Sequence, residues 1–85
     1  MTVYVDKPIH KYRRMIMCHM MADSIEELHE MADKIGINRK WFQPKSSPHY
    51  DVCTSKRKLA IMNGAEEADR NKIVMLIKYY RGLKS

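Results

Sequence analysis

Apolar residues recur at helical spacing between residues 24 and 36, and this is the clearest pattern in the chain. The apolar positions repeat every three or four residues, and acidic side chains fill the opposite side. Ser24 followed by Glu27 has the spacing of a capping box, in which the serine oxygen accepts a hydrogen bond from an otherwise unpaired backbone amide. Gly36 then supplies a residue that can end a helix in the left-handed conformation. The pattern predicts a helix over residues 25–35.

Three short runs rich in apolar or β-branched residues predict strands. Residues 2–5 are closed by the turn-forming Asp-Lys-Pro of residues 6–8, residues 15–21 are almost continuously apolar, and residues 49–53 follow two prolines. About nine residues separate the first two runs, too few for a helical crossover. The second run, the helix at 25–35 and the third run can form a right-handed βαβ unit with parallel strands.

The C-terminal part of the chain carries two further helical patterns. Thr54 or Ser55 is expected to cap a second helix that ends before Gly64. A last helix is expected at about residues 66–82, with acidic residues in its first turn and basic residues in its last. The order is therefore strand, strand, helix, strand, helix, helix. We expect one α/β domain over residues 1–85, with a mixed three-stranded sheet and about three helices.

The formal net charge of +6 is unevenly distributed along the 85 residues. Residues 1–33 hold four basic and six acidic side chains, whereas residues 34–85 hold twelve and four. This division favours a polyanionic partner for the basic part, and a solvated surface is the alternative. Two cysteines are too few for a disulfide framework, and no apolar run approaches the ~18 residues of a membrane span. With no signal-peptide pattern, the sequence predicts a cytoplasmic protein that does not bind membranes.

Several short motifs together resemble one family. They are Val3-Tyr4-Val5-Asp6 with Pro8, His19 with Asp23 and His29, Trp41-Phe42-Gln43, His49-Tyr50-Asp51, and Ser55-Lys56-Arg57. The family consists of short bacterial and phage proteins and is catalogued only as a domain of unknown function. The similarity covers roughly residues 1–65, and the last helix lies outside it. The resemblance implies an intracellular protein of a bacterium or of a phage-infected cell, and it implies no activity.

The strongest local feature is the polar stretch around the start of the second predicted helix. Backbone amides at a helix start, a hydroxyl cap and adjacent cations together form a typical phosphate site. Aromatic side chains in the preceding connection could stack on a base. The candidate ligand-binding residues are Arg39, Lys40, Trp41, His49, Tyr50, Ser55, Lys56 and Arg57. The alternative is an ordinary capped helix with a solvated basic face and with Trp41 in the core.

A second constellation combines carboxylates and imidazoles. Asp6, His19, His49 and Asp51 are candidate catalytic residues, because carboxylates could hold Mg²⁺ or Mn²⁺ and a histidine could act as general base. Asp23 is a further candidate metal ligand with Asp6 and Asp51. Antiparallel pairing of the first two strands would place Asp6 and Asp23 at opposite ends and weaken this hypothesis. The alternative is that the histidines and the acids are structural hydrogen-bond partners.

Cys18, His19, His49 and Cys53 include the ligand types of zinc. Neighbouring residues in a strand point to opposite faces, so Cys18 and His19 cannot readily bind one ion. We therefore expect no zinc and no resident cofactor, with Mg²⁺ or Mn²⁺ only under the catalytic alternative.

These observations favour a protein that binds a phosphate-bearing ligand, a nucleotide or a nucleic acid, without catalysing a reaction. One alternative is a metal-dependent phosphodiesterase or nuclease that uses aspartates and a histidine. Another is an interaction module for an acidic protein. Val74, Met75 and Tyr79 lie beside the main apolar stripe of the last helix, and this extra apolar surface predicts a homodimer through that helix.

Overall fold

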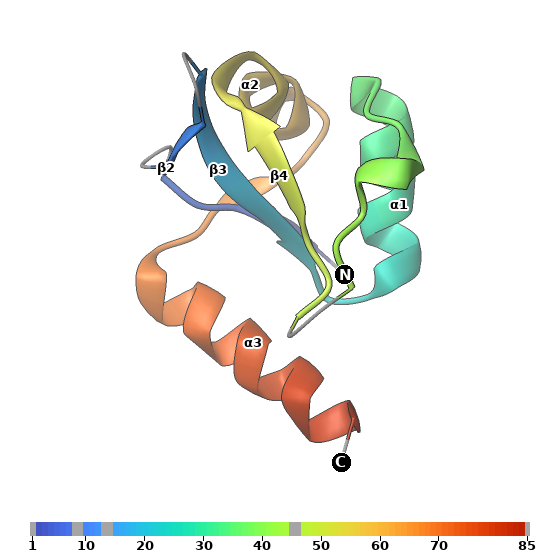
Figure 1. The fold of residues 1–85 in the computed structure, drawn as a ribbon, viewed down its shortest axis with the longest axis vertical. Coiled ribbons are helices and arrows are strands. Elements are labelled where there is room, and N and C mark those ends of the chain that lie inside the picture. Colours follow the sequence, from blue (N-terminus) through green and yellow to red (C-terminus); the bar gives the residue numbers. More distant parts are fainter. Residues whose placement is uncertain (1, 8–9, 13–14, 45–46, 85) are drawn as a thin grey trace.

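The computed structural model describes residues 2–7, 10–12, 15–44 and 47–84. The chain forms a mixed α/β fold with helices on both sides of one sheet (Figure 1). The elements in chain order are β1 (Val3–Val5), β2 (His10–Tyr12), β3 (Met15–Ala22), α1 (Ile25–Ile35), the short 3₁₀ helix η1 (Arg39–Trp41), β4 (Tyr50–Cys53), α2 (Thr54–Met62), β5 (Glu66–Glu67) and α3 (Arg70–Lys84). The expected order of three strands and three helices is confirmed, and two short strands, β2 and β5, are added to it.

The sheet is organised around β3, the longest strand. β3 pairs antiparallel with β1 and β2 along one edge and with β4 along the other, and β5 pairs parallel with β1. Met20 lies opposite both Val5 and Tyr50, so β1 and β4 occupy opposite edges of β3. The expected three-stranded sheet is therefore wrong, because five strands take part.

The expected parallel βαβ unit is also wrong, because β3 and β4 run antiparallel. α1 runs from the end of β3 back along the sheet. The described residues 36–44 then run past α1, and residues 47–49 lead into β4 at the end of the sheet where β3 finished (Figure 1). Gln43 forms an isolated antiparallel bridge with His49. β4 consequently begins beside Met20 and runs toward Met17, opposite to β3 (Figure 1).

Alternation along the strands creates two apolar clusters, one on each face of the sheet. The cluster beneath α1 and α2 contains Val3, Val5, Cys18, Met20, Ala22, Leu28, Met31, Ala32, Ile35, Tyr50, Val52, Ala60 and Ala65. The cluster beneath α3 contains Met21, Ala68, Ile73, Leu76 and Tyr80. Met20 and Met21 belong to different clusters because neighbours in a strand point to opposite faces.

α1 begins and ends where the sequence predicts. Ser24 Oγ accepts a hydrogen bond from Glu27 N at 3.3 Å, and Gly36 adopts a positive φ of 79°. In that conformation the Gly36 amide donates to carbonyls of the last helical turn, which satisfies groups that the helix end leaves unpaired. These local signals explain why the predicted and the observed bounds of α1 agree.

The two later helices begin elsewhere than expected. α2 follows β4 directly, its N-cap is Cys53, and this residue makes no side-chain capping bond. The expected cap at Thr54 or Ser55 is therefore wrong. α3 spans Arg70–Lys84 rather than about residues 66–82, because the residues of β5 pair with β1 instead of opening the helix.

Candidate metal centre

A row of polar side chains crosses the sheet on the face that α3 partly covers. The register of β1 and β3 continues to place Asp6 opposite His19, where Asp6 N donates to His19 O at 3.1 Å, and His19 lies opposite Asp51 in β4. His49 precedes Asp51 by two residues and therefore points to the same face. Met21, which contacts α3, is two residues from His19 on that face. The row of polar side chains thus lies beside the apolar cluster beneath α3.

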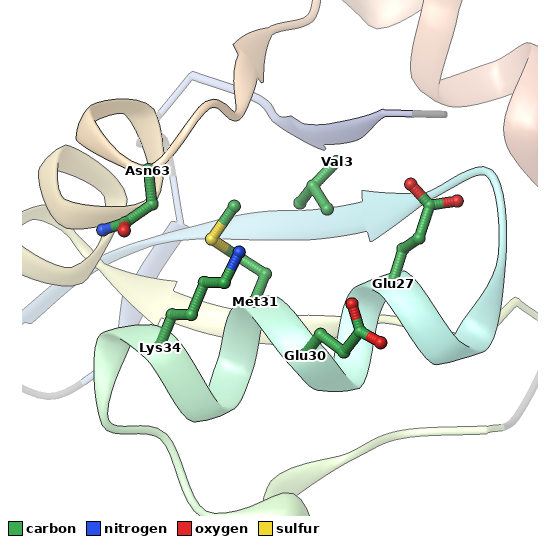
Figure 2. Close-up of a pocket in the computed structure, with 6 residues that line it drawn as sticks. All are labelled: Val3, Glu27, Glu30, Met31, Lys34 and Asn63. Atoms are coloured by element: carbon green, nitrogen blue, oxygen red, sulfur yellow. The ribbon is translucent and has the colours of Figure 1, made fainter.

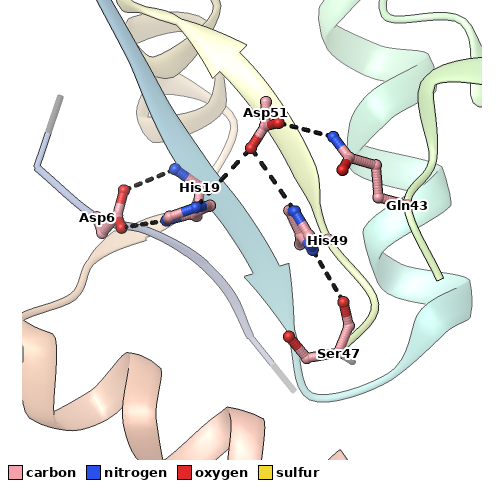
Figure 3. A network of polar contacts seen from close by, with 6 residues as sticks. All are labelled: Asp6, His19, Gln43, Ser47, His49 and Asp51. Carbon is pink, nitrogen blue, oxygen red and sulfur yellow. Dashed lines mark hydrogen bonds and ion pairs between the residues drawn. The ribbon is translucent and has the colours of Figure 1, made fainter. Parts of the chain in front are cut away.

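Two imidazole nitrogens and one carboxylate oxygen converge in this row (Figure 3). His19 Nε2 lies 3.9 Å and His49 Nε2 lies 3.7 Å from Asp51 Oδ1. One donor atom from each of the three residues lies within 4.8 Å of the others. Both distances to Asp51 exceed those of a hydrogen bond. The three donor atoms therefore lie close together without a direct hydrogen bond between them.

Each imidazole is held through its other nitrogen. His19 Nδ1 lies 2.8 Å from Asp6 Oδ2, and His49 Nδ1 lies 2.9 Å from the carbonyl oxygen of Ser47. An ionised carboxylate and a carbonyl only accept hydrogen bonds, so each Nδ1 carries a hydrogen, and the neutral form of each ring would have its lone pair at Nε2. Hydrogen bonds of this kind are the ones that orient metal-binding histidines in proteins.

We call Asp6, His19, Gln43, His49 and Asp51 the His–Asp cluster. It is partly open to solvent, with side-chain exposures of 15% for Asp6, 31% for His19, 19% for His49 and 40% for Asp51. Gln43 Nε2 donates to Asp51 Oδ2 at 2.6 Å. The hydrogen bond that His19 Nδ1 donates to Asp6 raises the pKa of His19, burial opposes this rise, and the charges of Asp6 and Asp51 add to it. The raised pKa favours protonation of His19, and a proton on Nε2 would compete with a metal ion for that atom.

The donor set fits a transition-metal ion. Two imidazoles and one carboxylate are the protein ligands of many catalytic zinc sites and of non-haem Fe²⁺ sites. Tetrahedral ligands at bond lengths of about 2.1 Å lie about 3.4 Å apart. Small side-chain rotations would therefore close the present separations of 3.7 and 3.9 Å around an ion. Mg²⁺ prefers oxygen ligands alone, so this site suits Zn²⁺, Mn²⁺ or Fe²⁺ better than Mg²⁺. Of the two ions named for the catalytic alternative, Mn²⁺ is therefore the better fit.

Asp23 lies apart from the His–Asp cluster. β1 and β3 are antiparallel, so Asp6 and Asp23 flank opposite ends of their pairing. Asp23 Oδ2 accepts a hydrogen bond from Thr2 N at 3.0 Å. The expected convergence of Asp6, Asp23 and Asp51 is therefore wrong for Asp23.

Two of the four cations expected to bind phosphate contact other parts of the fold. Lys56 Nζ donates to Ile35 O at 2.7 Å, at the end of α1. Arg57 donates from Nε to Asp6 O and from a terminal nitrogen to Glu67 Oε1, both at 2.8 Å, and its side chain is 14% exposed. Lys56 thus joins α2 to α1, and Arg57 joins α2 to β1 and β5.

The aromatic candidates are separated from one another. Tyr50 is fully buried, with its hydroxyl 2.6 Å from His29 Nδ1, because alternation in β4 directs it into the core. Trp41 is 62% exposed, so the alternative that placed it in the core is wrong. Lys40 Nζ lies 5.2 Å from the centre of the Trp41 ring.

Arg39 and Ser55, the remaining phosphate candidates, have local partners. Arg39 forms an exposed ion pair of 2.8 Å with Asp33, and Ser55 Oγ lies 3.2 Å from Cys53 Sγ. Of the eight residues expected to bind the phosphate-bearing ligand, only His49 is a member of the His–Asp cluster.

Sequence reasoning missed the parts played by Gln43 and by the Ser47 carbonyl. Gln43 belongs to a motif that the family resemblance singled out, but its contact with Asp51 depends on the path of the connection before β4. Pro44 and Pro48 signalled only an extended path there. No sequence signal could have identified the Ser47 carbonyl.

A separate hollow of about 160 Å³ lies beside α1 (Figure 2). Its lining residues are Val3, Glu27, Glu30, Met31, Lys34 and Asn63. Those from α1 follow helical spacing and carry both signs of charge, as on an ordinary solvated helix face. We assign no function to this hollow.

The fold and the His–Asp cluster define a small α/β protein with a candidate metal site on the open part of a sheet face. A family model described as a protein of unknown function, DUF4031, matches residues 3–79, and the chain belongs to this family. The match reaches into α3, so the expectation that the similarity ends near residue 65 is wrong. No curated protein and no solved structure matches the chain. Among the described residues, none of the helices has the length and apolarity to cross a bilayer.

Proposed function

We propose that this protein is a metal-dependent hydrolase of phosphate esters, in which His19, His49 and Asp51 hold a divalent transition-metal ion. One observation carries the proposal: both imidazoles are fixed through Nδ1, so that both Nε2 atoms face the same oxygen of Asp51. A metal ion with three protein ligands keeps positions for water and substrate. Water bound to such an ion can reach a pKa of about 7, which supplies hydroxide at neutral pH.

The charges of the chain support an anionic substrate. Asp6 and Asp51 together balance the charge of one divalent ion, so the loaded site would not repel a phosphate. Residues 34–85 carry twelve basic and four acidic side chains, and such an excess attracts polyanions. A nucleotide or a nucleic acid in a bacterial or phage-infected cytoplasm is the source of phosphate that we propose.

A non-catalytic phosphate binder is the second candidate, and the exposure of Trp41 favours it. An indole that is 62% exposed with an ammonium 5.2 Å away could stack on a base. The contacts of Lys56 and Arg57 with backbone carbonyls weigh against it, because these cations already stabilise the fold. Binding that is indifferent to EDTA and occurs without turnover would favour this candidate.

The hydrolase proposal is tested with an activated phosphodiester, bis(4-nitrophenyl) phosphate, in the presence of Zn²⁺, Mn²⁺ or Fe²⁺. Asp51→Asn removes the ligand charge and should lower the rate at least ~100-fold, because changing only an outer-shell partner of a metal ligand already costs about 10–100-fold. The matched control is Asp33→Asn, which changes an exposed carboxylate in the ion pair with Arg39 and should leave the rate unchanged. Equal rates for both variants, or a rate that EDTA does not reduce, would exclude the proposal.

A further inference from the structure

The carboxylate of Asp6 makes two contacts with a single residue of β3. Its Oδ1 accepts a hydrogen bond from His19 N at 2.7 Å, and its Oδ2 lies 2.8 Å from His19 Nδ1 (Figure 3). A backbone amide can only donate, and an ionised carboxylate can only accept. With both oxygens engaged in this way, Nδ1 of His19 must carry a hydrogen.

We infer that Asp6 is a positioning residue that sets the tautomer of His19 and thereby makes Nε2 available to a metal ion. This inference rests on the metal site proposed above. A neutral imidazole has one N–H group and one lone pair. With the hydrogen on Nδ1, the lone pair is on Nε2, the atom that lies 3.9 Å from Asp51 Oδ1.

An asparagine at position 6 has nearly the same shape but reverses the pattern of donors. The His19 amide remains a donor and takes the carboxamide oxygen. The carboxamide NH₂ group then faces Nδ1, which must accept, so the imidazole hydrogen moves to Nε2. Asp6→Asn should therefore block ligation by His19 with little change in side-chain volume.

His49 provides an internal reference for the same measurement. Its Nδ1 donates to the backbone carbonyl of Ser47, so no substitution at Asp6 changes its partner. Its tautomer should be the same in the wild type and in Asp6→Asn. Asp23→Asn is the matched control variant, because Asp23 Oδ2 also accepts from a backbone amide, at the opposite end of the β1–β3 pairing.

The experiment records long-range ¹H–¹⁵N correlations of the histidine rings in the full, metal-free chain, at a pH where the rings are neutral. We expect an Nδ1–H tautomer for His19 in the wild type and in Asp23→Asn, and an Nε2–H tautomer in Asp6→Asn. Titration with Zn²⁺ should then show an affinity about 10–100-fold weaker in Asp6→Asn and within about twofold of wild type in Asp23→Asn.

The outcomes separate this inference from the proposed function. An Nε2–H tautomer in the wild type overturns the inference without any variant, so it stays testable even if Asp6→Asn does not fold. A tautomer change without loss of Zn²⁺ affinity overturns the link to metal binding. A wild type that shows the expected tautomers but binds no Zn²⁺ overturns the proposed function, while the role of Asp6 in selecting the tautomer is supported.

Discussion

Neighbouring residues in β3 and β4 occupy opposite environments. His19 is partly exposed and Met20 is fully buried, and Asp51 is exposed while Val52 is buried. A slip of one residue in either strand would turn the imidazole or the carboxylate into the apolar cluster beneath α1. The core therefore fixes the register that brings the His–Asp cluster together.

The two cysteines should differ sharply in reactivity. Burial, with the nearby charge of Asp6, raises the pKa of Cys18 to about 12. Burial also acts to raise the pKa of Cys53, but hydrogen bonds from Ser55 and from backbone amides outweigh it, so the pKa of Cys53 is lowered. The thiolate is the reactive species. We therefore expect dithiodipyridine to modify Cys53 rapidly in the folded chain and Cys18 only after unfolding. Cys53→Ser should abolish the fast reaction, and two equally fast thiols would contradict the burial of Cys18.

Residue types alone indicated part of the candidate site. Asp6, His19, His49 and Asp51 could be selected because they flank or interrupt apolar runs. Their contacts could not be predicted, since these depend on which residue of β3 lies opposite which residue of β4, and long-range pairing decides that. Tyr50 was placed among the ligand-binding residues for the same reason, although alternation buries it.

Among the elements, α1 could be predicted in full and the sheet only in part. α1 carries its own signals in Ser24, Glu27 and Gly36, which act over one turn. β2 and β5 have three and two residues, too few to show an alternating pattern. The direction of β4 depends on its pairing with β3, and only the packed fold determines that pairing.

Tyr80 on α3 stabilises the fold, and we expect this stabilisation to be lost at alkaline pH. Its hydroxyl donates to the carbonyl of Ala22, and burial raises its pKa to about 12, compared with about 10 in an unfolded chain. Below pH ~10 the Tyr80 hydroxyl is protonated in both the folded and the unfolded chain, so its contribution to the free energy of unfolding is complete. As pH rises toward ~12, the hydroxyl ionises first in the unfolded chain, and this contribution to stability is lost.

Tyr80→Phe tests this account by urea unfolding between about pH 9 and about pH 11. The variant should lose about 1 kcal/mol of stability at neutral pH with the hydrogen bond, and its stability should fall less steeply above pH ~10 than that of the wild type. Tyr79→Phe, at a position 54% exposed, should behave as the wild type does. Parallel pH profiles for wild type and Tyr80→Phe would show that Tyr80 is not the source of the loss.

For the whole molecule, a homodimer through α3 stays a prediction. Val74, Met75 and Tyr79 are 39%, 62% and 54% exposed, and the last two line a hollow of about 360 Å³. Light scattering should give about twice the chain mass of 10.1 kDa, and the double variant Met75→Lys/Tyr79→Lys should give the single chain mass. Met62→Lys on α2, at a position 80% exposed, is the control and should leave the dimer intact. A wild type of single chain mass at high concentration would refute the dimer.

The helices cover the two faces of the sheet unequally, and this is what leaves a place for chemistry. α1 and α2 bury one face, whereas α3 packs on the other face near Met21 and leaves the His–Asp cluster partly open. A substrate could therefore reach the same place on the sheet where the ligand atoms of the His–Asp cluster are held. The proposed hydrolysis requires those ligand atoms to bind a metal ion.

Titration of the ¹⁵N-labelled, metal-free chain with Zn²⁺ tests that claim most directly. Binding should saturate at one ion per chain and shift the Nε2 resonances of His19 and His49. The ring of His29, whose Nδ1 contacts the hydroxyl of Tyr50, should be unaffected. Absence of saturable binding, or binding that shifts His29 and spares the other two, would contradict the account.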